Sequence, residues 1–255
     1  MRFFLLSFML VELSSCQKIS EFKDYKEMKV DTVDYRKTFK VNDSVNAQYT
    51  ARILIFPELK EKSIEKNIYR DYDFTAYSPE TLSYYFDEQS SALFARSDKI
   101  FKRYPQRLNL FFHTDMKVLY RDNRYLNLQY YWITYEGGSH PNDVYKDKVF
   151  DLKKGVHVHL SDLLTIPNHL LSKMLMENYP KAIIRESRGL THQQLLIEKV
   201  IPVPENFYFD QQYFYFHFQP YDITEYKAGD VVIPISIQDL KPYLAVDFKG
   251  HMNIK

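Results

Sequence analysis

Cysteine and glycine are scarce in this sequence, which holds a single cysteine, Cys16, and six glycines in 255 residues. One cysteine cannot form an internal disulfide, and it leaves little basis for a thiol nucleophile or a cysteine-based metal site. The chain also has no run of roughly 20 apolar residues, the length that a transmembrane helix needs. Its formal net charge is +1, without the concentrated basic face that a nucleic-acid partner requires. Disulfide scaffolds, thiol enzymes and nucleic-acid binders are therefore disfavoured.

The first sixteen residues have the pattern of an export signal. Arg2 precedes a short apolar run over residues 3–11, and the small residues of Leu13-Ser14-Ser15 precede Cys16. This pattern predicts a bacterial lipoprotein signal peptide over residues 1–15, with acylation of Cys16 as the link to the membrane. The alternative is a buried cysteine that follows a hydrophobic N-terminal strand. With Gln17 next to the cysteine, we expect a lipid-anchored protein of the cell envelope, at the outer membrane where the cell has one.

The rest of the chain is rich in aromatic residues, with 22 Tyr and 19 Phe. Tyr and Phe favour half-buried strands, so the composition points to sheets. We expect an α+β fold in which an antiparallel sheet has helices packed on one face. The expected organisation is a tether over residues 16–45, an N-terminal companion segment over 46–124 and a C-terminal domain over 125–250.

Two segments have a clear alternation of faces. In the strand expected over residues 125–135, Leu128, Tyr130 and Trp132 share one face, while Gln129 and Tyr131 share the other, which predicts one core face and one partly wet face. In the strand near the C-terminus the phenylalanines are expected to point inward and the residues between them outward. The inward set is Phe214, Phe216 and Phe218, and the outward set is Tyr213, Tyr215 and His217. Between residues 80 and 101, apolar spacings of three and four predict a long amphipathic helix.

Several short segments together resemble a known family. They are Tyr135-Glu136-Gly137-Gly138-Ser139-His140-Pro141-Asn142, Phe150-Asp151-Leu152 with Gly155, Leu160-Ser161-Asp162-Leu163-Leu164, and the ending Pro220-Tyr221-Asp222-Ile223 with Val232-Ile233-Pro234-Ile235. The sequence resembles the exported domain of unknown function that is shared by the lysozyme-sensing anti-sigma-V factor and the non-catalytic part of a peptidoglycan deacetylase. The resemblance covers roughly residues 125–245, and more weakly extends back to about residue 47.

The resemblance implies an envelope module that binds or senses, with a lysozyme-like protein or peptidoglycan as its partner. Anti-sigma activity is not implied, because the chain has no cytoplasmic segment for it. Loops on a rigid sheet usually carry recognition, and tyrosine offers a large contact area at a low entropy cost. The candidate binding residues are Glu136, His140, Tyr131, Tyr135, Tyr213 and Tyr215. For His140, a bond to a backbone carbonyl that ties down its loop is an equally good interpretation.

The pair His157 and His159 is the main hint of chemistry. Two imidazoles two residues apart on one strand match a spacing found in zinc sites, with His140, Asp151 or His217 as third ligand. Two histidines alone are a weak basis, so a metal-dependent hydrolase that acts on cell-wall material is the alternative hypothesis. Serine, phosphate-loop and paired-carboxylate motifs do not appear. We therefore expect a non-enzymatic protein with no catalytic residues and no cofactor.

Overall fold

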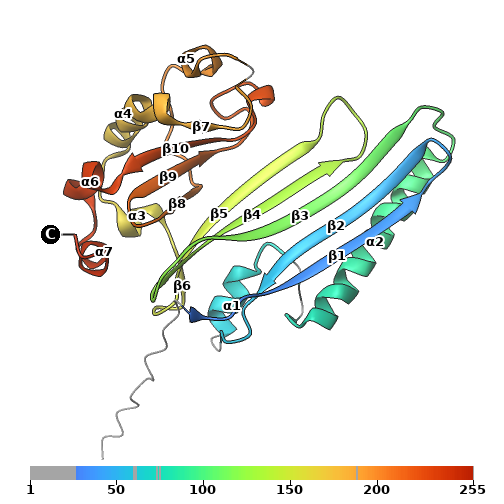
Figure 1. Cartoon of the computed structure of the whole chain (residues 1–255), viewed down its shortest axis with the longest axis horizontal. Coiled ribbons are helices and arrows are strands. Elements are labelled where there is room, and N and C mark those ends of the chain that lie inside the picture. The colour runs from blue at the N-terminus through green and yellow to red at the C-terminus, as the bar shows by residue number, and fades with distance from the viewer. Residues whose placement is uncertain (1–26, 60–61, 73, 75, 188, 255) are drawn as a thin grey trace, which may run out of the picture.

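The computed structural model describes residues 27–59, 62–72, 74, 76–187 and 189–254. Within these ranges the chain forms two β-sheets, each accompanied by helices, which lie next to each other in Figure 1. The predicted signal peptide and Cys16 lie outside the described residues. In the described ranges, no helix combines the length and apolar character that crossing a membrane requires.

The first sheet has six strands in sequence order. They are β1 (Asp31–Lys40), β2 (Val45–Ile55), β3 (Leu108–Arg121), β4 (Tyr125–Tyr135), β5 (Asn142–Asp151) and β6 (Val156–Val158). Neighbouring strands are antiparallel except for β2 and β3, which are parallel. A parallel pair needs a long crossover, and here the helices α1 (Lys62–Ile68) and α2 (Pro79–Phe101) lie within it.

Helix α2 covers one face of β1 and β2 (Figure 1). It begins after Ser78, whose hydroxyl accepts a hydrogen bond from the Thr81 N–H at 3.2 Å. Its apolar stripe turns towards the sheet, where the fully buried ring of Phe86 lies 5.7 Å from the ring of Tyr35. The amphipathic helix predicted between residues 80 and 101 is therefore confirmed.

The second sheet has four strands in the order β7-β10-β9-β8. Its strands are β7 (Ile183–Ile184), β8 (Phe207–Phe209), β9 (Tyr213–Phe218) and β10 (Val231–Ser236). The helical elements around it are α3 (Leu160–Leu163), α4 (Asn168–Asn178), η2 (Tyr179–Lys181), α5 (His192–Leu195), η3 (Tyr226–Ala228), α6 (Ile237–Leu240), η4 (Lys241–Tyr243) and α7 (Val246–His251). Phe214, Phe216 and Phe218 are buried in its core, as their alternation predicts.

The two units meet where strand β8 packs against the first sheet. Because β6 pairs with only the last residues of β5, the earlier part of β5 would be a free edge. Side chains of the second unit occupy that edge: Gln219 Oε1 accepts a hydrogen bond from the Tyr145 N–H at 2.8 Å, and Asn206 Nδ2 donates to the Tyr145 carbonyl at 3.0 Å. The edge is thus satisfied within the chain.

The α+β class is confirmed, but three details differ from the sequence-based expectations. The strands form two sheets, with one parallel pair, rather than one antiparallel sheet. The segment expected as a tether includes β1, whose Val33 and Tyr35 pack against the core. The hairpin of β3 and β4 spans the boundary placed between residues 124 and 125, because both strands belong to the first sheet.

Candidate functional site

The face of the first sheet that lies opposite α2 is covered only in part. The alternation predicted for β4 is confirmed: Leu128 and Tyr130 are buried in the core under α1 and α2, whereas Tyr131 lies on the other face. On that other face, β4, β5 and the end of β3 meet the second unit, whereas the surface over β1, β2 and the start of β3 is open. The open part holds a shallow hollow of 710 Å³ between β1 and β4, which Thr50, His113 and Tyr131 help to line.

A buried histidine lies between the two units. His217 on β9 is 1% exposed, and its Nδ1 lies 2.6 Å from Asp147 Oδ2 on β5. Its Nε2 lies 3.3 Å from Asp230 Oδ2, just before β10. Burial on its own would lower the pKa of His217, but the hydrogen bond to Asp147 and the nearby carboxylate of Asp230 raise it to about 9. The side chain is therefore a buried imidazolium at neutral pH, and the expectation that His217 points outward is wrong because the first sheet covers it.

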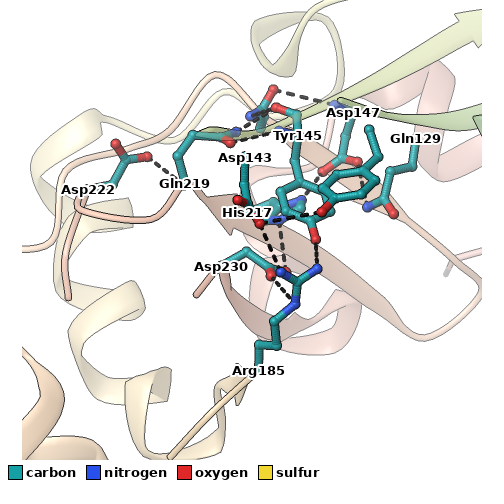
Figure 2. A network of polar contacts seen from close by, with 11 residues as sticks. Gln129, Asp143, Tyr145, Asp147, Arg185, His217, Gln219, Asp222 and Asp230 are labelled. Atoms are coloured by element: carbon teal, nitrogen blue, oxygen red, sulfur yellow. Dashed lines mark hydrogen bonds and ion pairs between the residues drawn. The ribbon is translucent and has the colours of Figure 1, made fainter. Parts of the chain in front are cut away.

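Arg185, which follows β7, extends this polar contact across the interface. Figure 2 shows its guanidinium among carboxylates and a tyrosine from both units. Its Nη1 donates to Asp143 Oδ2 at 3.0 Å, its Nε lies 3.3 Å from Asp230 Oδ1, and its Nη2 donates to the Tyr145 hydroxyl. The guanidinium carbon also lies 5.9 Å from the ring centre of Tyr131. We call Asp143, Tyr145, Asp147, Arg185, His217 and Asp230 the interface cluster.

The interface cluster acts as a clamp between the units. It pairs carboxylates with an imidazolium and a guanidinium in a region where unpaired charges would be costly. Truncating one member would leave its partner buried without compensation. The cluster thereby links β5 of the first sheet to β9 and to the residues beside β7 and β10 of the second.

Three aromatic rings lie beside this clamp, one on the turn between β4 and β5 and two on the segment between β9 and β10; His140 and Tyr221 are exposed, and Tyr226 is half-buried. The imidazole of His140 stacks on Tyr226 with ring centres 4.0 Å apart, and Tyr221 lies 5.4 Å from Tyr226. His140 Nδ1 contacts the Pro141 carbonyl at 2.7 Å, and the Tyr226 hydroxyl donates to the same carbonyl at 2.8 Å. We call His140, Tyr221 and Tyr226 the aromatic patch.

Tyr221 has an unusual backbone conformation for a bulky residue. Its φ is +77°, and its side chain is 58% exposed. It follows Pro220 in a turn that Asp222 closes by donating its N–H to the Gln219 carbonyl at 3.1 Å. The third position of such a turn normally holds glycine or asparagine, because other side chains are strained at positive φ. A strained and exposed aromatic residue points to a functional role, since nothing in the core requires it.

Four of the predicted binding residues lie on β4 or in the turn between β4 and β5. His140 belongs to the aromatic patch, and both interpretations of this residue fit, because its ring is exposed while Nδ1 contacts a backbone carbonyl. Tyr131 is half-buried and stacks on Tyr145 at 4.6 Å. The Tyr135 hydroxyl donates to the Gly138 carbonyl at 3.0 Å, and exposed Glu136 forms an ion pair with Arg96 of α2. The turn between β4 and β5 needs glycine at positions 137 and 138, because Gly137 and Gly138 have φ of +92° and +122°.

The other two predicted binding residues lie elsewhere. Tyr213 and Tyr215 are on β9 of the second sheet, with ring centres 6.0 Å apart. Tyr215 stacks on Tyr208 at 4.6 Å, and its hydroxyl donates to Asp210 Oδ2 at 2.8 Å. They form a separate tyrosine group by the β8–β9 turn. The structure does not bring them to the aromatic patch.

The histidine pair on and beside β6 does not gather a third ligand. The rings of His157 and His159 are 4.9 Å apart. Of the nominated third ligands, Asp151 accepts a hydrogen bond from Arg124 Nε at 2.9 Å, His217 is in the interface cluster, and His140 is in the aromatic patch. Over the described ranges, no group of three or more His, Cys, Asp or Glu side chains is placed to hold a metal ion.

Sequence reasoning missed the residues that give this region its geometry. Asp147, Arg185 and Asp230 come from three separate segments, so their proximity depends on how the two units pack. Tyr221 and Tyr226 lie in the segment that carries the family resemblance, yet they were not chosen as candidates. The segment Pro220-Tyr221-Asp222 could have pointed to Tyr221, because a proline followed by polar residues is typical of a turn.

Comparisons with known proteins agree with this fold. Residues 158–238 match a family model described as Protein of unknown function (DUF3298). A crystal structure of a DUF3298 family member from Bacteroides fragilis is similar with a TM-score of 0.73 and 17% sequence identity, covering 91% of this chain and 100% of that one. A DUF3298 family protein from Pseudomonas aeruginosa is similar with a TM-score of 0.59 and 10% identity, covering 87% of this chain and 96% of that one. No curated protein matches the chain.

Proposed function

We propose that this chain, in which residues 158–238 match the DUF3298 domain, is a lipid-anchored binding or sensing protein of the cell envelope. The observation that carries the proposal is the aromatic patch, in which His140 and the strained Tyr221 are exposed. The patch comes from two loops, the β4–β5 turn and the segment between β9 and β10. Recognition residues usually lie on loops that a rigid scaffold positions.

The interface cluster supplies the rigidity that such a site needs. Asp143 joins the two groups directly, because one of its oxygens accepts a hydrogen bond from Arg185 and the other lies 3.4 Å from the Tyr226 hydroxyl. A patch held in its binding geometry loses less side-chain entropy when a ligand arrives. The aromatic rings are therefore already ordered before the ligand binds.

The ligand class follows from the chemistry of the patch. Tyrosine and histidine rings offer apolar faces with polar edges, which suit either the sugar rings of peptidoglycan or an aromatic contact with a protein. The resemblance to the domain of the lysozyme-sensing anti-sigma-V factor supports a lysozyme-like protein as partner. Nothing in the described residues gathers a catalytic set around the patch, so binding without turnover is the function the geometry supports best.

The envelope location depends on the N-terminal segment. Acylation of Cys16 would hold the two units outside the membrane, with the outer membrane as the location in a two-membrane cell. Growing the producing bacterium with labelled palmitate tests this directly. Label in the mature protein supports the anchor, and its loss in a Cys16→Ser variant assigns the site.

The binding proposal is tested with two ligands in parallel. The purified protein is mixed with hen-type lysozyme and, separately, with purified peptidoglycan sacculi, and co-sedimentation or capture is measured. A Glu136→Ala/His140→Ala variant is the comparison, because both side chains are exposed at the β4–β5 turn. Binding to one ligand that weakens in the variant supports the proposal and identifies the partner. Failure to bind either ligand would contradict it.

A further inference from the structure

A second site lies beside β6, on a part of the chain that the proposed function does not use. A pocket of 480 Å³ opens where β6 ends and β5 continues as an edge, and the segments before α4 and before β8 close it. Its lining includes a group of basic and imidazole side chains, here the basic wall, and a group of apolar side chains, here the apolar wall, together with the carboxylates of Asp147 and Glu205. The basic wall holds Lys146, Lys148, His157 and His159, and the apolar wall holds Leu164, Ile166, Leu171, Val203 and Phe207.

We propose that this pocket binds a small amphipathic anion, a carboxylate or a phosphate monoester that carries an apolar chain. The proposal does not depend on the binding function of the aromatic patch. It rests on the division of the pocket into two walls of different chemistry.

Among the charged residues of the lining, Lys146 and Lys148 are basic and Asp147 and Glu205 are acidic, but Asp147 already pairs with His217. Lys146 and Lys148 both pair with Asp71, at 2.9 and 2.6 Å, so two ammonium groups share one carboxylate. The side chain of Lys148 is 9% exposed and also lies 5.1 Å from the ring centre of Tyr130. Glu205 is exposed at the rim of the pocket. Asp71 can neutralise the charge of only one of the two lysines, and a bound anion would neutralise the charge of the other.

The pKa of His157 depends on its burial and on the charges around it. Burial lowers its pKa to about 4, and the positive charge of Lys148 and Arg70 and the neighbouring His159 act in the same direction. Asp71 is the carboxylate that opposes them. Burial is the main cause of the low pKa of His157, and the nearby cations Lys148 and Arg70, which lower it further, would also attract an anion.

The apolar wall and the volume of the pocket fit an organic ligand better than a small inorganic ion. Leu164, Leu171 and Phe207 are at most 4% exposed. A water molecule takes roughly 30 Å³ in the liquid, so the pocket is far larger than a single small ion needs. Its volume falls within the range of about 300–1,000 Å³ that small organic ligands occupy. An apolar chain would cover the buried side chains while the anionic group meets the lysines.

The test uses five ligands that separate the two walls. Octanoate and octyl phosphate carry both an anionic group and an apolar chain, inorganic phosphate lacks the chain, octanol lacks the charge, and octylamine reverses it. Each is titrated into the purified protein below its micelle-forming concentration, with calorimetry for affinity and the ring resonances of His157 for location. We expect octanoate or octyl phosphate to bind at least tenfold more tightly than the other three and to shift the His157 resonances.

A charge-reversal variant links the affinity to the basic wall. Lys146→Glu should weaken binding of the preferred anion at least tenfold, and because Lys146 is 47% exposed the protein should still fold. Lys173→Glu on the outer side of α4, where the lysine is 73% exposed, is the control with the same change in charge and should leave the affinity unchanged. Equal affinity for octanol, equal affinity for inorganic phosphate, an unaffected Lys146→Glu protein, or no binding at all would each overturn the proposal.

Discussion

His217 Nδ1 and Asp147 Oδ2 lie 2.6 Å apart, although 70 residues separate the two side chains in the sequence. The side chains are 1% and 0% exposed, and they belong to different sheets. Because the pair is desolvated, each partner relies on the other for compensation of its charge. The contact is therefore a buried ion pair among the polar contacts that join the two units.

Replacing this histidine should be costly. A His217→Gln protein keeps a similar volume but leaves Asp147 and Asp230 without a cation between them, and removing one partner of a buried pair typically costs about 3–5 kcal/mol. Denaturant unfolding measures the loss. The double variant His217→Gln/Asp147→Asn should recover part of it, since the buried charge is then removed as well. A cost below about 1 kcal/mol for the single variant would show that the pair does not hold the units together.

The same residue predicts a pH dependence. The pKa of His217 is about 9 in the folded protein and near the ordinary 6.5 in the unfolded chain, so the folded state binds this proton more tightly. Its contribution to stability is complete below pH 6.5 and is lost as the pH rises towards 9. The free energy of unfolding should fall across this window, and the His217→Gln protein should lack that component of the slope. Identical slopes in the two proteins would count against the buried imidazolium.

Tyr221→Gly should stabilise the protein. Glycine removes the strain of a tyrosine at φ +77°, and this gain exceeds the added entropy of the unfolded chain by about 0.5–1 kcal/mol. Thermal unfolding checks the direction. Asn253→Gly, at the other non-glycine position with positive φ among the described residues, should gain less because asparagine tolerates that conformation. A clearly destabilised Tyr221→Gly protein would mean that the ring contributes packing rather than strain.

Arg124 is expected to secure the C-terminal helix. Its Nε donates to Asp151 Oδ2 at 2.9 Å, and its two terminal nitrogens donate to the two carboxylate oxygens of Asp247 on α7 at 3.0 and 2.6 Å. Arg124→Ala should cost about 3 kcal/mol, because Asp151 is buried and loses its cation.

Arg52 provides the exposed control for that prediction. It pairs with Asp34 at 2.9 Å, but both side chains are more than half exposed, so Arg52→Ala should cost at most about 1 kcal/mol. Chemical denaturation of both proteins gives the comparison. Similar costs for the two variants would contradict the structural role of Arg124.

Local pattern was enough to predict much of the fold. The spacing of Leu82, Phe86 and Leu93 gave α2, and the alternation along β4 and β9 gave their buried faces, because these signals depend only on residues near one another. The strand β1 has the same alternation in Val33 and Tyr35. However, lysines, arginine and aspartates dominate the composition of this segment and favour the prediction of a tether.

The site was predictable only in part. His140 and Glu136 were found because their loop stands out in the sequence, whereas the partners of the loop could not be found in the same way. Arg185 and Asp230 reach Asp143 and His217 only after the two sheets pack, and no local pattern encodes that contact. Tyr213 and Tyr215 were predicted from their outward positions on the strand and from the contact area that tyrosine offers, and the fold places them in a group of their own.

The most direct test of the central claim is the affinity of the Tyr221→Gly protein for whichever ligand, lysozyme or sacculi, the unaltered protein binds. Because this variant is expected to be more stable, any loss of affinity cannot come from unfolding. We predict at least a tenfold loss, while Tyr84→Ala, which removes a 66% exposed tyrosine from α2, leaves the affinity unchanged. Unaltered affinity in the Tyr221→Gly protein would contradict the account.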